Sequence, residues 1–122
     1  MKKPGRNTTL LAIAVAFSFS AANLTPLMAD QAAAKANWGE HCSKCHGDDG
    51  KGQTKMGLKL KVKDYSDPKV QATFEDAKMK KSIAEGTKDE AGKYTMKPFA
   101  DKLTEEQIVE LIAYTRSLVA KP

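Results

Sequence analysis

The sequence has 122 residues, which is enough for one domain and excludes a chain of several full-sized domains. Its 20 Lys and Arg residues outnumber its 15 Asp and Glu residues, giving a net charge of +5. Residues 1–29 hold three of the basic residues and none of the acidic ones, which leaves 17 basic against 15 acidic residues in the rest of the chain. A net charge of +2 over residues 30–122 does not indicate a general nucleic-acid partner.

The N-terminus has the pattern of a secretory signal peptide. It begins with the basic residues Lys2, Lys3 and Arg6. An uncharged run of Leu, Ala, Ile, Val, Phe and Ser follows over residues 10–22, and small residues come after it. The run is too short for a comfortable membrane span, which favours a cleaved signal over the alternative of an uncleaved anchor. We therefore predict export through a cleaved signal peptide, with no permanent membrane anchor.

Two cleavage points fit this pattern. We place the cut after Ala29, which makes residues 1–29 the signal peptide and residues 30–122 a single mature domain. The alternative is a cut after Ala22, where Ser20 and Ala22 satisfy the small-residue rule better than Leu27 and Ala29 do.

The first helix of the mature domain is predicted from Asp30 to Lys44. Its start is rich in alanine, a strong helix former. Ala34, Trp38 and Cys42 recur every four residues, so they share one face of this helix.

This helix ends in the pentapeptide Cys42-Ser43-Lys44-Cys45-His46. Two cysteines three residues apart and followed at once by histidine form the attachment sequence for c-type haem. The two thiols would add to the two vinyl groups of one porphyrin, so that haem c is bound covalently through Cys42 and Cys45. His46 would then offer an imidazole nitrogen to the iron as its proximal ligand.

Three other uses of the two cysteines are weaker. A disulfide between Cys42 and Cys45 would close a very small loop and constrain the unfolded chain little. A thiol–disulfide oxidoreductase usually carries such a pair at the start of a helix that follows a strand, whereas this pair ends a helix. A zinc site would have three ligands at most, because no second cluster of Cys or His exists in the sequence.

A glycine-rich segment, Gly47-Asp48-Asp49-Gly50-Lys51-Gly52, follows the histidine and is expected to form turns with positive φ. Residues 51–67 are predicted to be a loop laid over the haem with its apolar side inward. Apolar residues and lysines alternate from 58 to 63, so one short strand is the alternative. The segment also carries the lysines 51, 55, 59, 61 and 63.

Two further helices are predicted in the second half of the chain. One runs from Pro68 to Glu85, with Asp67 as N-cap and Gly86 as C-cap, and is either continuous or broken near residues 73–76. Residues 87–103 are predicted to be loop. The last helix follows Thr104, which has Gln107 three residues on in the form of a capping box, and it runs to about residue 120. Its apolar stripe is Ile108, Leu111, Ile112, Thr115, Leu118 and Val119.

The second axial ligand decides between electron transfer and chemistry at an open iron. His41 precedes the attachment sequence on the same side and is expected to be exposed. Met79 lies mid-helix, where methionine usually fills the core, and Met56 lies only ten residues after His46. Met96 lies in an extended loop that Pro98 stiffens and the last helix anchors. We predict Met96 as the second ligand, with core packing or a surface position as the alternatives.

The chain resembles a small class I c-type cytochrome, a periplasmic single-haem electron carrier, over about residues 33–119. The resemblance rests on Cys42-Ser43-Lys44-Cys45-His46, Gly47-Asp48-Asp49-Gly50-Lys51-Gly52, Ile83-Ala84-Glu85-Gly86, Met96-Lys97-Pro98-Phe99 and Leu111-Ile112-Ala113-Tyr114-Thr115-Arg116-Ser117-Leu118. It implies an all-α fold of three to five helices wrapped around one covalently attached haem. It also implies that Trp38 and Tyr114 pack where the first and last helices cross, and that Met96 ligates the iron.

The chain departs from the family pattern in two places. Lys97 separates Met96 from Pro98, where the family often has proline directly after the methionine. Gly57-Leu58 stands where the family often has Gly-Pro, and a carbonyl near Leu58 is expected to accept the histidine N–H instead.

The resemblance implies an electron carrier rather than an enzyme, whose iron cycles between ferric and ferrous with His/Met ligation. The alternative is a haem enzyme or gas sensor with an open sixth position. Redox proteins are the expected partners. The lysines of 51–63, together with Lys97 and Lys102, are expected to form a basic rim that steers an acidic partner, or else a merely solvated lysine face.

Overall fold

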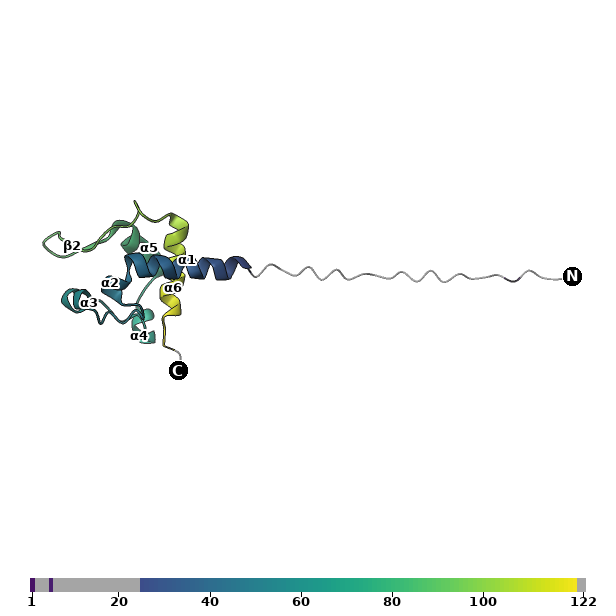
Figure 1. Cartoon of the computed structure of the whole chain (residues 1–122), viewed down its shortest axis with the longest axis horizontal. Helices are drawn as coiled ribbons and strands as arrows, with labels where there is room; N and C mark the ends of the chain where they lie inside the picture. Colours follow the sequence, from purple (N-terminus) through teal and green to yellow (C-terminus); the bar gives the residue numbers. More distant parts are fainter. Residues whose placement is uncertain (2–4, 6–24, 121–122) are drawn as a thin grey trace.

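The computed structural model describes Met1, Gly5 and residues 25–120 (Figure 1). The basic start and apolar run of the predicted signal peptide lie outside these described residues. The elements of the structure are α1 (Thr25–His41), α2 (Ser43–His46), α3 (Lys55–Leu60), α4 (Pro68–Gln71), α5 (Asp76–Glu85), β1 (Thr87–Lys88), β2 (Tyr94–Met96) and α6 (Glu105–Ser117). The described part thus has six helices and one two-stranded sheet, which confirms the all-α class; the six exceed the predicted three to five because α2 and α4 are single turns.

The frame of the domain is the crossing of α1 and α6, which pack on each other (Figure 1). At the crossing the rings of Trp38 and Tyr114 lie 5.6 Å apart between centroids, as the family resemblance implied. The core around it contains Trp38, Met79, Leu103, Ile108, Leu111 and Ile112. The apolar stripe predicted for α6 is therefore the face that packs inward.

Helix α6 begins where the sequence predicted. The Thr104 side chain accepts a hydrogen bond from the Gln107 N–H, and the Gln107 side chain accepts one from the Thr104 N–H. This reciprocal capping box satisfies two of the helix's free N–H groups. The helix ends at Ser117, three residues earlier than predicted.

The first predicted helix, Asp30–Lys44, is in fact two helices. α1 starts at Thr25 and ends at His41, and α2 is a separate turn that begins after Cys42. The Cys42 carbonyl accepts from both the Cys45 and His46 N–H groups, which tightens the chain locally. A cut after Ala29 would remove the first five residues of α1, whereas a cut after Ala22 would leave this helix whole.

The prediction of a loop over residues 51–67, with a strand over 58–63 as its alternative, is wrong for residues 55–60. Residues 55–60 form α3, because the Thr54 side chain accepts from the Gly57 N–H and caps the helix. Lys61 ends it in the left-handed conformation, at φ 55°. The apolar residues do not all face inward either, since Leu58 is 69% exposed.

The segment 68–85 is broken, which was one of its two predicted forms. Asp67 caps α4 by accepting from the Lys69 N–H, as predicted. The chain then leaves helical geometry before α5, whose last residue, Glu85, is followed by Gly86 as the C-cap with φ 74°. Met79 on α5 is 8% exposed, which confirms its prediction as core filler.

Residues 87–103 contain a small hairpin where only loop was predicted. β1 and β2 are antiparallel, with Thr87 opposite Met96 and Lys88 opposite Tyr94. The Asp89 side chain accepts from the Ala91 and Lys93 N–H groups and so shapes the turn. The hairpin projects from the end of the domain where α1 stops (Figure 1).

Among the described residues, none of the helices combines the length and the apolar character that crossing a bilayer requires.

Candidate haem site

Cys42 and Cys45 flank the start of α2, and both are half-buried free thiols. They form no disulfide with each other. Burial, with a smaller contribution from the neighbouring Cys45, raises the pKa of the Cys42 thiol to about 12. An unbound Cys42 is therefore a protonated thiol at neutral pH and not the reactive thiolate that a dithiol oxidoreductase uses.

His46 closes the same turn and is enclosed by two aromatic rings. The Tyr65 ring stacks on the imidazole at 5.2 Å and 20°, and the Trp38 ring lies tilted at 5.7 Å. Burial lowers the pKa of His46, so the imidazole is neutral at neutral pH and can act as a metal ligand. The Trp38 indole N–H donates to the Gly47 carbonyl at 2.9 Å and ties α1 to the chain just after the histidine.

The Nδ1 atom of His46 is buried and has no hydrogen-bond partner among the described residues. The prediction that a carbonyl near Leu58 accepts its N–H is therefore not met in this structure. A buried polar atom without a partner costs about 1–3 kcal/mol, so such an imidazole is normally held by another interaction.

The turn after His46 is braced by α3. The Thr54 hydroxyl donates to the Cys45 carbonyl at 2.7 Å while it caps α3. Gly57 packs so closely that a Cβ there would clash with the same carbonyl and with that of Gly52. Gly57 thus has a packing role in the place where the family often has Gly-Pro.

Met96 is the last residue of β2 and is half-buried. Gly86 packs against its backbone, since a Cβ on Gly86 would lie 2.5 Å from the Met96 carbonyl. The chain after Met96 is anchored on α5, where the Phe99 N–H donates to the Ile83 carbonyl at 3.0 Å. The Met96 segment is therefore held on both sides, as a ligand-bearing loop requires.

Replacing Gly86 with alanine is expected to destabilise the Met96 segment strongly. At φ 74° and ψ 179° the Gly86 backbone is in a region that only glycine adopts easily, and the new methyl group would meet the Met96 carbonyl. Strain and overpacking together should lower the free energy of unfolding by roughly 3–5 kcal/mol.

Gly92 provides the matched control, because its φ is 78° but a Cβ there would meet nothing within 4 Å. Gly92→Ala should cost about 1 kcal/mol, from backbone strain alone. Denaturant unfolding of both variants measures the difference, and equal losses would show that the contact with Met96 is unimportant.

Two of the three other residues weighed as the second ligand, Met56 and His41, have defined positions in the structure. Met56 is 36% exposed on α3. His41, predicted to be exposed, is instead half-buried with a side chain that is 17% exposed. The Phe99 ring, from the segment after Met96, covers it at 5.7 Å. No sequence pattern indicated this contact, because the two residues lie far apart in the chain.

These features fit a covalently bound haem. Two free thiols and a neutral imidazole belong to one helical turn, which is the donor set that the attachment sequence requires. Further apolar surface is available from half-buried side chains around the core, among them Tyr65, Phe74, Ile83 and Phe99.

Comparison with known proteins gives the same assignment. The family Cytochrome c matches residues 31–119. The solved structure of the KustC0563 c-type cytochrome is similar, with 31% identity and a TM-score of 0.62, over 71% of this chain and 98% of that one. The structure of a tyrosine-to-phenylalanine mutant of Kustc0563 is also similar, with 32% identity and a TM-score of 0.60, over 70% of this chain and 96% of that one. No curated protein matches. This chain belongs to the cytochrome c family, and it carries covalently bound haem c and serves haem-based electron transfer.

Proposed function

We propose that this protein is a periplasmic electron carrier whose haem is bonded to Cys42 and Cys45 and whose iron is ligated by His46 and Met96. The observation that supports it best is the turn of α2, which carries two free thiols and, directly after the second of them, the half-buried imidazole of His46. The predicted signal peptide and the family's usual export support the periplasm.

Bound haem supplies the Fe(III)/Fe(II) couple. The chain's own residues keep the surroundings of the haem constant while the charge of the iron changes. Trp38 and Tyr65 enclose His46, and the contacts of Gly86 and Phe99 fix the Met96 segment. A thioether ligand and a dry surrounding favour the ferrous ion and raise the reduction potential. With both axial positions filled, the protein would transfer electrons without acting as an enzyme.

The visible spectrum of the exported protein tests this function. We expect a reduced c-type spectrum and, in the oxidised form, the weak far-red band that a methionine sulfur on ferric haem iron gives. A high-spin oxidised spectrum without that band, together with tight binding of carbon monoxide by the reduced form, would instead indicate the alternative of an open sixth position.

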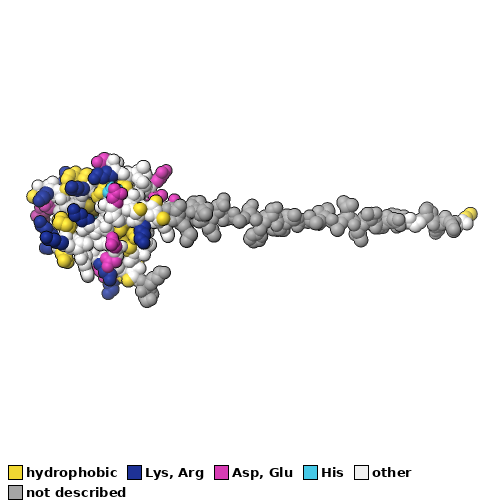
Figure 2. Space-filling view, in the orientation of Figure 1, with side chains coloured by type: hydrophobic (Ala, Val, Ile, Leu, Met, Phe, Trp, Pro, Cys, Tyr) yellow, Lys and Arg dark blue, Asp and Glu magenta, His cyan; other side chains and the backbone are white. Residues whose placement is uncertain are grey.

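The partners we propose are redox proteins with acidic docking surfaces. The lysines of residues 51–63 are all exposed, and among the described residues none of them lies within ion-pairing distance of a carboxylate. The exposed Met56 and Leu58 lie between them on α3. In Figure 2, basic and hydrophobic side chains are interspersed over the side of the domain that carries α3 and the hairpin. Lys97 and Lys102 are also exposed.

Reversing two of these charges should slow electron transfer to an anion. In a Lys55→Glu/Lys59→Glu variant, the rate of oxidation by ferricyanide at low ionic strength should fall by on the order of tenfold. A matched Lys78→Glu/Lys81→Glu variant changes the same net charge on α5, where both lysines have ion-pair partners, and should have a smaller effect. Stopped-flow rates over a range of ionic strength measure both. Rates that do not depend on salt, or equal effects of the two variants, would contradict steering by the 51–63 lysines.

A further inference from the structure

The His46 imidazole is at the end of a row of three aromatic rings. Tyr65 stacks on it at 5.2 Å and 20°, and the Phe74 ring meets Tyr65 edge-on at 5.2 Å and 69°. Because His46 Nδ1 has no hydrogen bond within the described residues, the imidazole plane is not held by the usual carbonyl acceptor. The rings that limit the rotation of the imidazole are therefore Trp38, tilted at 5.7 Å, and Tyr65, which is the one that lies nearly parallel to it.

Tyr65 is held in turn by a buried amide. Gln71, the last residue of α4, is 6% exposed, and its side-chain NH₂ donates to the Tyr65 carbonyl at 2.7 Å and to the Thr115 carbonyl at 2.8 Å. Its side-chain oxygen accepts from the Arg116 guanidinium at 3.1 Å. The amide therefore has all its donors in use, and it links the backbone of Tyr65 directly to α6.

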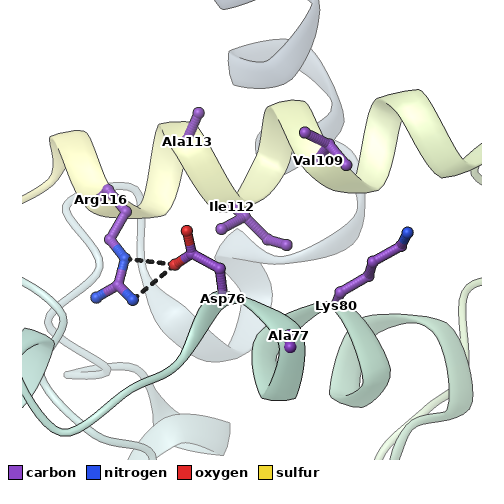
Figure 3. A pocket seen from close by; sticks show the side chains of 7 residues that line it. All are labelled: Asp76, Ala77, Lys80, Val109, Ile112, Ala113 and Arg116. Carbon is purple, nitrogen blue, oxygen red and sulfur yellow. Dashed lines mark hydrogen bonds and ion pairs between the residues drawn. The ribbon is translucent and has the colours of Figure 1, made fainter.

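Arg116 on α6 fixes the other end of the same segment. It donates to the Gln71 carbonyl at 2.7 Å and to the Phe74 carbonyl at 2.8 Å. It also donates through two nitrogens to the Asp76 carboxylate, at 3.0 and 2.7 Å (Figure 3). One planar guanidinium thus binds three points between α4 and α5, which a lysine ammonium cannot reproduce.

We propose that Tyr65 is a positioning residue for His46, and that Gln71 and Arg116 act through it by holding its backbone. This proposal rests on His46 as an iron ligand in the function proposed above. A guanidinium on α6 and an amide on α4 then determine the orientation of a ligand on α2. Within the described residues, none of the hydrogen bonds of this network involves either cysteine.

The first test compares Tyr65→Leu with Tyr65→Phe in the haem-loaded protein. Leucine removes the ring that stacks on the imidazole, whereas phenylalanine keeps it. The readout is the low-spin ferric electron paramagnetic resonance spectrum, whose largest g-value depends on the orientation of the axial ligands. We expect Tyr65→Leu to shift and broaden that line, because the imidazole then adopts several orientations, and Tyr65→Phe to keep the wild-type line.

The second test uses Arg116→Lys, which keeps the charge but loses the planar fork. We expect a smaller shift and broadening of the same line than in Tyr65→Leu. Lys80→Gln is the matched control: Lys80 pairs with Glu105, so this variant also removes an ion pair between α5 and α6, but one outside the network. It should keep the wild-type line even where it lowers the melting temperature.

The outcomes separate this proposal from the proposed function. A wild-type spectrum without histidine ligation contradicts both. If the wild-type spectrum shows histidine ligation and the spectra of Tyr65→Leu and Arg116→Lys are identical to it, only the positioning role is overturned. This holds even if both variants melt at lower temperature. If Tyr65→Leu does not load haem, the line of Arg116→Lys decides between the two results.

Discussion

Replacing both Cys42 and Cys45 with alanine is expected to give a colourless protein that does not unfold cooperatively. The buried apolar residues in the described part are few: Ala34, Trp38, Met79, Leu103, Ile108, Leu111 and Ile112. The predicted mature domain, residues 30–122, is small, and domains of this size bury a modest fraction of their surface. Much of the remaining apolar surface, including Tyr65, Phe74 and Phe99, is only half-buried by the polypeptide.

A haem bonded to this chain would give that half-buried surface an apolar partner. Loss of the covalent anchor should therefore remove a large part of the roughly 5–15 kcal/mol that typically stabilises a domain. Circular dichroism in denaturant measures the loss as the disappearance of the sharp unfolding transition of the haem-loaded protein. Retained helical signal with no sharp transition is the expected result.

Ser43→Ala is the control, because this residue lies between the two cysteines and leaves both thiols in place. Its hydroxyl donates to the Gly39 carbonyl at 2.8 Å, so its loss should cost about 1 kcal/mol or less. A double cysteine variant that melts as sharply as Ser43→Ala would contradict the structural role of the haem.

Replacing Met96 with alanine should open the sixth position of the iron. We expect loss of the far-red band in the oxidised protein and tight binding of added carbon monoxide in the reduced protein. Axial ligands set haem potentials over a range of roughly 0.8 V, and removal of the thioether should lower the potential by a sizeable part of that range. Spectroscopy and potentiometry on the same sample measure both effects.

Two other methionines serve as controls for this substitution. Met79 is buried on α5, and Met79→Leu conserves its volume, so that it should cost less than about 1.5 kcal/mol and leave the spectrum unchanged. Met56→Leu changes an exposed side chain on α3. Loss of the far-red band in Met56→Leu, with the band intact in Met96→Ala, would assign the ligand to Met56 instead.

The elements that the sequence predicted well are those determined by neighbouring residues. The capping box of Thr104 and Gln107 and the stripe of α6 are local patterns, and both are present in the structure. The N-cap at Asp67 and the turn at Gly86 were predictable for the same reason.

The errors arise where a local pattern was misleading or too short, and where a distant contact decides. α3 is capped by Thr54, whose hydroxyl also donates to Cys45, and the alternation of lysines over residues 58–63 concealed this short helix. The strands of the hairpin have two and three residues, too few to show an alternating pattern. His41 was predicted to be exposed because its cover, Phe99, comes from a remote segment.

The residues of the candidate site likewise fall into those that the sequence predicted and those that it did not. The attachment sequence was recognisable because its spacing is set by the cofactor's chemistry. The roles proposed for Tyr65, Gln71 and Arg116 were not predicted, because they depend on contacts that only the fold creates, such as the hydrogen bond from Gln71 to the Thr115 carbonyl. A buried glutamine has that function only through its position in the fold.

The most direct test of this account is the mass of the proteolytic peptide that contains residues 42–46, taken from protein exported in a host with haem-attachment machinery. We predict a peptide heavier by one haem, with neither cysteine modified by an alkylating reagent. A peptide of unmodified mass whose two thiols both react with the reagent would contradict the account.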